Sequence, residues 1–223
     1  MNNRKQAKQK FYGKTTMAYS HQYQSAAVLE SELEADFFNW VNFEGCYEHF
    51  EMQPDSIFYY HNNKRLRYTA DALLTITSHK SQRIYIEIKY KREADKPELI
   101  EKFKRLKKYF NENGCIFVVL TEEDIRVGER TNNLNYLHPA LAYSAPVEEL
   151  NDLLSHTTKK TMSHDEFVTL QTKFNAKSCL LRRAVAHRLL SCDLTLPFEK
   201  LILSLSSDIK PTTPISIQLQ KSL

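Results

Sequence analysis

The chain has 223 residues, of which 42% are hydrophobic. This is enough to bury one good core or two small ones, so a mainly disordered protein is excluded. No window approaches the ~18 uncharged apolar residues of a membrane span, and no apolar stretch follows the charged N-terminus. We therefore expect neither a span nor a signal peptide, and a cytoplasmic protein. Four cysteines without a Cys-x-x-Cys pair and only four glycines argue against a structural zinc site and a Walker or dinucleotide-binding loop.

The net charge of +4 is small but unevenly distributed. Residues 1–16 hold five bases and no acid, and residues 88–110 hold nine bases against four acids. A run of this kind is more often a solvated helix face than a phosphate-binding surface. The charge alone leaves both interpretations open.

The N-terminal part of the chain is predicted to be a basic flexible arm over residues 1–22, followed by a helix over residues 26–43. The helix has an apolar stripe at near 3.6-residue spacing, formed by Leu29, Leu33, Phe37 and Trp40. Glu30 and Glu34 fall inside the apolar arc of this helix. Two carboxylates are therefore predicted to face the core.

Three strands are predicted next. Residues 46–60 and 65–77 surround a turn at residues 61–64, and the second strand places Asp71 on the face opposite its alanines. A third strand follows a turn at residues 78–82, with isoleucines on one face. Glu87 and Lys89 alternate with these isoleucines and are therefore expected to point together.

The remaining pattern alternates helix and strand before it becomes mainly helical. Asp95 and Glu98 resemble a capping box that opens a basic helix ending at residues 113–114, and an apolar run over residues 115–121 suits a buried strand. After residue 146, three short helices and a few strand candidates suggest a winged-helix module. The helices are expected at residues 147–154, 163–174 and 178–190, and the strands near residues 194, 201–205 and 215–219.

Asp71 together with Glu87-Ile88-Lys89 forms the pattern Asp…Glu-x-Lys. Hard carboxylate oxygens bind Mg²⁺, which polarises a scissile phosphate, and a nearby lysine offsets charge in the transition state. The Ile88 carbonyl is a further candidate ligand, and a helix carboxylate, Glu30 or Glu34, would complete the set. The competing interpretation is an exposed cross-strand ion pair. The core-facing glutamate and the neighbouring aspartate favour the metal site, because buried carboxylates need a cation.

At this point the sequence resembles the PD-(D/E)xK restriction-endonuclease-like superfamily, and in finer detail the TnsA family of transposon endonuclease subunits. The matching segments are residues 30–38 (ESELEADFF), 50–54 (FEMQP), 68–74 (YTADALL), 87–89 (EIK), 124–126 (DIR) and 130–134 (RTNNL). Ala70 stands where the superfamily has a proline. The Ser-x-Leu-Glu motif selects Glu34 over Glu30.

The resemblance implies an α/β fold with a restriction-endonuclease-like mixed sheet flanked by helices over residues 23–146. A winged-helix-like domain over residues 147–210 and a tail over residues 211–223 would follow. It also implies that Glu34, Asp71 and Glu87 are metal-site carboxylates and that Lys89 is the catalytic lysine, with Mg²⁺ bound by Asp71, Glu87 and the Ile88 carbonyl, Glu34 near a second position, and Mn²⁺ as a substitute.

In the TnsA family, the endonuclease subunit cuts the non-transferred strand at the 5′ ends of the transposon during cut-and-paste DNA transposition. The expected partners are therefore double-stranded DNA at transposon ends, the DDE transposase TnsB and the AAA+ ATPase TnsC. Two alternatives remain. One is a stand-alone restriction or repair nuclease of the same superfamily, and the other is a non-catalytic winged-helix DNA-binding or interaction protein.

Overall fold

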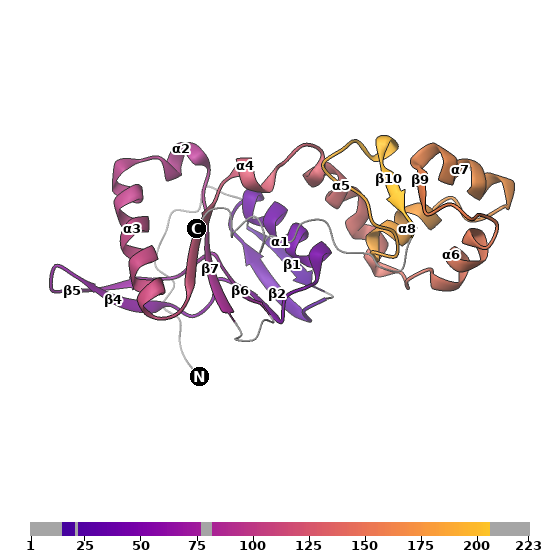
Figure 1. Ribbon diagram of the computed structural model, residues 1–223. Helices are drawn as coiled ribbons and strands as arrows, with labels where there is room; N and C mark the ends of the chain where they lie inside the picture. The colour runs from indigo at the N-terminus through magenta and orange to yellow at the C-terminus, as the bar shows by residue number, and fades with distance from the viewer. Residues whose placement is uncertain (1–14, 21, 77–81, 206–223) are drawn as a thin grey trace.

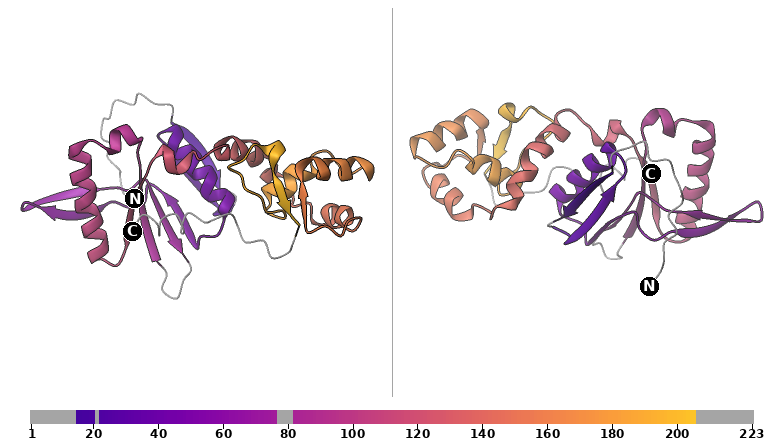
Figure 2. Two further views of the ribbon diagram at one scale, coloured as in Figure 1. Left: turned by 45° about the horizontal axis from the view of Figure 1, so that its top comes forward. Right: turned by 180° about the vertical axis from the view of Figure 1, so that it is seen from behind.

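The computed structural model describes residues 15–20, 22–76 and 82–205 of the chain. Two lobes lie side by side and give an elongated molecule (Figure 1; Figure 2). The first lobe contains the elements from β1 to α4, and the second contains those from α5 to β10. Across the described ranges, no helix combines the length and apolar character needed to cross a membrane.

A four-stranded mixed sheet forms the centre of the first lobe. Its strands are β3 (His49–Met52), β6 (Ala72–Ile76), β7 (Gln82–Ile88) and β8 (Ile116–Leu120), in the order β3-β6-β7-β8. β6 runs antiparallel to both of its neighbours, β3 and β7, whereas β8 is parallel to β7. A parallel neighbour requires a crossover connection, and here it contains α2 (Lys91–Ala94) and α3 (Pro97–Glu112). The predicted α/β fold with a mixed sheet flanked by helices is confirmed.

One helix covers each face of this sheet. On one face α1 (Glu32–Glu44) packs Phe37 into a core with Leu74 and Ile86, all fully buried. On the other face α3 contributes Phe110, whose ring stacks on Phe117 of β8 with centroids 5.5 Å apart. Successive side chains along each central strand point to opposite faces of the sheet and therefore contribute to different cores.

A long hairpin leaves the first lobe beside α3 (Figure 1). It consists of β4 (Ile57–His61) and β5 (Lys64–Tyr68), joined through Asn62 and Asn63 with φ values of 49° and 61°. Two central residues with positive φ match the right-handed twist of the strands they join. The prediction of single strands over residues 46–60 and 65–77 is therefore wrong, because each stretch divides between the hairpin and the main sheet.

The N-terminal prediction also needs correction. Strands β1 (Thr16–Ser20) and β2 (Ser25–Leu29) pair as a second hairpin, so the predicted arm ends too late and the predicted helix begins too early. The helix begins only after Ser31, whose side chain accepts a hydrogen bond from the Glu34 N–H. Residues 1–14 lie outside the described part of the chain.

The basic helix α3 begins as the proline predicts, but without the predicted capping box. Pro97 occupies its first turn and Lys96 is the N-cap, with no side-chain hydrogen bond to the helix. Asp95 instead ends the preceding helix α2. Proline preorganises the first turn without a cap, because its missing N–H would have no partner there.

The rest of the chain is mainly helical. Its elements are α4 (Glu122–Ile125), α5 (Arg130–Leu137), η1 (His138–Ala142), α6 (Val147–Leu154), β9 (Thr161–Ser163), α7 (His164–Lys173), α8 (Leu180–Ala186), η2 (Phe198–Lys200) and β10 (Ile202–Ser204). Strands β9 and β10 pair antiparallel. The predicted capping box of α7 is confirmed, since Ser163 and Glu166 each accept the other's backbone N–H.

Helices on both sides of the predicted boundary after residue 146 contact one another, and the domain bounds stay a prediction. Helix α5, which precedes it, lies against both α1 and α8. The Asn133 amide on α5 also donates to the carbonyls of Leu194 and Leu196 at 2.8 Å each. The winged-helix assignment stays a prediction, and the strand expected at residues 215–219 lies outside the described residues.

Candidate active site

The backbone around Asp71 is held from two sides. Its N–H donates to the Ile86 carbonyl at 3.0 Å, and its carbonyl accepts the Gln53 N–H at 2.8 Å. The Asp71 carboxylate oxygen Oδ2 then accepts the N–H of Ile88 at 2.7 Å. β5 and β6 are separate strands, and the chain bends between them. These hydrogen bonds hold Asp71, which lies in the bend, at the C-terminal end of β7.

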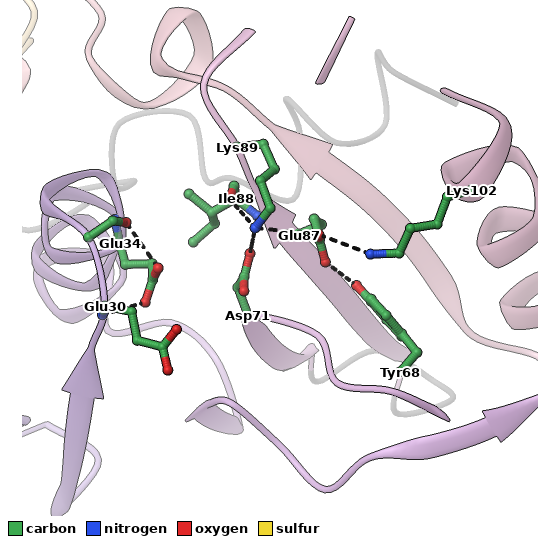
Figure 3. Close-up of polar contacts among 9 residues, drawn as sticks. Glu30, Glu34, Tyr68, Asp71, Glu87, Ile88, Lys89 and Lys102 are labelled. Atoms are coloured by element: carbon green, nitrogen blue, oxygen red, sulfur yellow. Dashed lines mark hydrogen bonds and ion pairs between the residues drawn. The ribbon is translucent and has the colours of Figure 1, made fainter. Parts of the chain in front are cut away.

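The ammonium of Lys89 lies between three oxygens (Figure 3). Its Nζ is 3.1 Å from Asp71 Oδ2, 3.0 Å from the Ile88 carbonyl oxygen and 3.4 Å from Glu87 Oε1. The alternation of β7 thus brings Glu87 and Lys89 together as predicted. The three oxygens expected to bind a metal ion face one point, and a positive charge lies there.

Glu87 has two further partners that the sequence did not reveal. Its side chain is only 3% exposed, and its Oε2 accepts the Tyr68 hydroxyl at 2.5 Å. The Lys102 ammonium on α3 is 3.6 Å from Glu87 Oε1. Tyr68 and Lys102 therefore both stabilise this buried carboxylate.

Glu34 lies apart from this cluster. One of its carboxylate oxygens accepts the Glu30 N–H and the other accepts the Ser31 hydroxyl, each at 2.9 Å. Its charge is near enough to raise the pKa of Asp71, and Figure 3 shows it on the α1 side of the cluster. Glu30 is exposed and precedes the helix, so its predicted core-facing position is wrong.

The cluster shifts the ionisation of its members. Burial raises the pKa of Asp71 to about 6, and the Glu87 carboxylate adds to this, whereas the Lys89 ammonium and the Ile88 N–H act in the opposite direction. Burial disfavours the charged form of Lys89, but the Asp71 and Glu87 carboxylates more than offset it and raise the pKa of this lysine. Burial, with the Glu87 carboxylate, raises the pKa of Tyr68, so its hydroxyl remains a donor. Buried side chains with shifted pKa values are typical of functional sites.

The donor set fits a hard divalent cation. Two carboxylates and a carbonyl are ligands that suit Mg²⁺ and Mn²⁺, and the Lys89 position shows that they already stabilise a positive charge. Among the described residues, no three His, Cys, Asp or Glu side chains form a group that could hold a metal ion. This agrees with the geometry, because the third oxygen is the backbone carbonyl of Ile88 and Glu34 turns toward its own helix.

The mixed sheet flanked by helices is consistent with a restriction-endonuclease-like fold, and the cluster lies at the C-terminal end of β7. Residues 46–122, about a third of the chain, match the family model of the TnsA-like endonuclease N-terminal domain. The chain thus contains a TnsA-like domain, which indicates a nuclease of the TnsA type. The matched segment includes Asp71, Glu87 and Lys89 but not Glu34. No curated protein matches the chain.

Proposed function

We propose that the protein is a metal-dependent DNA endonuclease that acts as one subunit of a heteromeric transposase. In this role it hydrolyses the non-transferred strand at the 5′ ends of a transposon, while a DDE transposase of the TnsB type processes the 3′ ends and an AAA+ ATPase of the TnsC type links the subunits to the target. The observation that carries the proposal is the convergence of Asp71, Glu87 and the Ile88 carbonyl on Lys89, within a TnsA-like domain.

Each residue of the cluster has a distinct role in this proposal. Asp71, Glu87 and the Ile88 carbonyl would hold Mg²⁺, or Mn²⁺ in its place, and Glu34 would support a second position. When bound, the cation polarises the scissile phosphate and lowers the pKa of water. Lys89 orients the attacking water and offsets negative charge that develops on the phosphate.

The test depends on which DNA strands are cut at the transposon ends. A DDE transposase that frees only the 3′ ends can join them to a target, but the donor DNA remains attached through the uncut 5′ strands. Replication then fuses donor and target into a cointegrate. We therefore expect Asp71→Ala to change the product from simple insertions to cointegrates without abolishing integration.

The experiment compares insertion products by long-read sequencing in a system reconstituted with the DDE transposase and the ATPase. Asp55→Ala serves as the control, because Asp55 is an exposed carboxylate on the loop before β4. An unchanged ratio of insertions to cointegrates, with Asp71→Ala folded and present, would show that this site does not make the 5′ cut. Cutting of plasmid DNA by the purified protein alone would instead favour a stand-alone nuclease.

A further inference from the structure

The β4–β5 hairpin has two faces of different character. Tyr59 and Tyr68 on the inner face are buried, and the Tyr59 ring lies 5.9 Å from the Tyr109 ring of α3. The outer face does not join either core. It carries four side chains, those of Phe58, Tyr60, Arg65 and Arg67, and all four residues are exposed.

The register of the hairpin arranges these four residues as two cross-strand pairs. Phe58 is opposite Arg67, and Tyr60 is opposite Arg65. Phe58 is 48% exposed and Tyr60 is 75% exposed. The Arg65 guanidinium lies 4.0 Å from the centre of the Phe58 ring. Large aromatic side chains and guanidinium groups thus share one solvent-facing surface, which we call the outer hairpin face.

The charge of the hairpin specifies the kind of partner. Residues 57–68 include the bases Lys64, Arg65 and Arg67 and no acid. Guanidinium groups bind phosphate oxygens through two parallel hydrogen bonds, and tyrosine is among the side chains that contact the phosphates and sugars of duplex DNA. A two-stranded β-ribbon also fits into the major groove of B-DNA. These properties together match duplex DNA.

The hairpin is covalently continuous with the candidate active site. Tyr68 at the end of β5 donates to Glu87, and Asp71 follows three residues later. Arg65 precedes Asp71 by six positions, and because the chain bends between β5 and β6 the span is at most roughly 20 Å at ~3.3 Å per extended residue. At ~3.4 Å per nucleotide along one strand, this is at most about six base pairs of DNA.

We propose that the outer hairpin face binds duplex DNA to one side of the cut, within about six base pairs of it. The proposal rests on the proposed function, since it places the DNA next to the site that would cut it. In this arrangement Arg65 and Arg67 contact phosphates, and Tyr60 near the tip inserts its exposed ring into the groove. The hairpin thereby fixes the position of the duplex relative to Asp71.

Binding is tested with the full-length protein, a fluorescein-labelled 30-base-pair duplex and EDTA, so that no cutting occurs. The Arg65→Ala/Arg67→Ala variant is expected to bind roughly tenfold more weakly. Its plot of log affinity against log salt concentration should flatten by about 1.8, because each lost phosphate contact removes ~0.9 from the slope. The control is Lys160→Ala/Lys200→Ala, which removes the same charge from exposed residues of the second lobe.

The outcomes separate this proposal from its alternatives. Equal weakening of both variants would mean that net charge alone is responsible and would overturn the proposal, as would no binding by the wild-type protein at low salt. Stronger binding to the single strand of the same sequence than to the duplex would also overturn it. Because EDTA removes the chemistry, binding through the hairpin and absence of nuclease activity are separate results.

A reporter at the tip does not depend on removal of any arginine. The only tryptophan of the chain, Trp40, is 4% exposed in the core, so Tyr60→Trp adds one exposed fluorophore. We expect the duplex to quench this fluorescence, with a midpoint that matches the affinity measured with labelled DNA. Full binding without any change in the Tyr60→Trp signal would place the DNA elsewhere and refute the proposal.

Discussion

The substitution Asp71→Asn is expected to stabilise the metal-free protein at neutral pH. Burial raises the pKa of Asp71 from 3.8 to about 6, a difference of about 2 units. Each unit corresponds to ~1.36 kcal/mol, so ionised Asp71 costs the folded state about 3 kcal/mol. Asparagine is neutral and keeps an acceptor for the Ile88 N–H. Its amide hydrogens lack a matched acceptor, which costs about 1 kcal/mol. The net gain in folding stability is therefore about 2 kcal/mol.

This gain depends on pH in a defined direction. Because the folded-state pKa lies above the unfolded value, the wild-type penalty is complete above pH ~6 and disappears as pH falls toward the unfolded pKa. The wild-type protein therefore becomes more stable relative to Asp71→Asn as the pH decreases from 7.5 to 4.5. A difference of 2 kcal/mol corresponds to about 4–8 °C in Tm for a chain of this size.

The assay is thermal unfolding in EDTA at pH 7.5, 6.0 and 4.5, with Asp55→Asn as a control for loss of an exposed carboxylate. Mg²⁺ is then added at pH 7.5, where it should raise the Tm of the wild-type protein but not that of Asp71→Asn, since a ligand stabilises only the state that binds it. If Asp71→Asn is less stable than wild type in EDTA, or if their difference does not change with pH, the argument from burial is wrong.

Other predictions concern the neighbours of Asp71 and the packing of both lobes. Lys89→Met should lose about 1–3 kcal/mol in EDTA, because two carboxylates lose their cation, and should gain more Tm than wild type when Mg²⁺ is added. Tyr68→Phe should lose about 1–3 kcal/mol, because Glu87 keeps its burial but loses its hydroxyl donor; an unchanged urea midpoint would contradict this. Phe37→Ala should cost about 3–5 kcal/mol through a cavity in the core, and Ser163→Ala about 1 kcal/mol through loss of the helix cap, both measurable by urea unfolding.

The strands of the main sheet could be predicted because burial alternates along them. The isoleucines of β7 are buried on the α1 side, so a spacing of two residues places Glu87 and Lys89 on the opposite face. The 3.4 Å distance between their charged atoms confirms this inference. The sequence also placed Asp71 near a strand adjacent to that of Glu87, and the pairing of β6 with β7 confirms that these strands are neighbours.

The N-terminal error arises from two periods that coincide at one residue. Leu29 fits the helical stripe that continues through Leu33, but it also alternates with Ala27, and both are buried from strand β2. A signal that distinguishes the two was present in the sequence. Ser31-x-x-Glu34 is the pattern of a capping box, and its serine does cap α1. This pattern predicts that the helix begins directly after Ser31, as it does in the structure.

The contacts of Glu87 could not have been inferred in the same way. Tyr68 reaches it from the end of a hairpin strand, and Lys102 reaches it from α3, a helix of the crossover between β7 and β8. Both contacts depend on how α3 and the β4–β5 hairpin pack on the sheet. Local periodicity shows which face of an element is buried, but it does not show which polar side chain at the edge of that face turns inward.

The lysines of the cluster have a structural role in addition to any chemical one. Glu87 is almost fully buried, and Lys89, Lys102 and the Tyr68 hydroxyl surround its carboxylate and offset the cost of burying it. Loss of activity after substitution of Lys89 would therefore combine a chemical effect with a change in the charge balance around Asp71 and Glu87.

Lys102 separates the two effects, because it shares Glu87 but does not contact Asp71 in the described network. If Lys89 acts on the phosphate, Lys102→Met should reduce stability in EDTA but retain more of the DNA-cutting activity than Lys89→Met does. Equal loss of activity in both variants would instead mean that Lys89 contributes through charge balance alone.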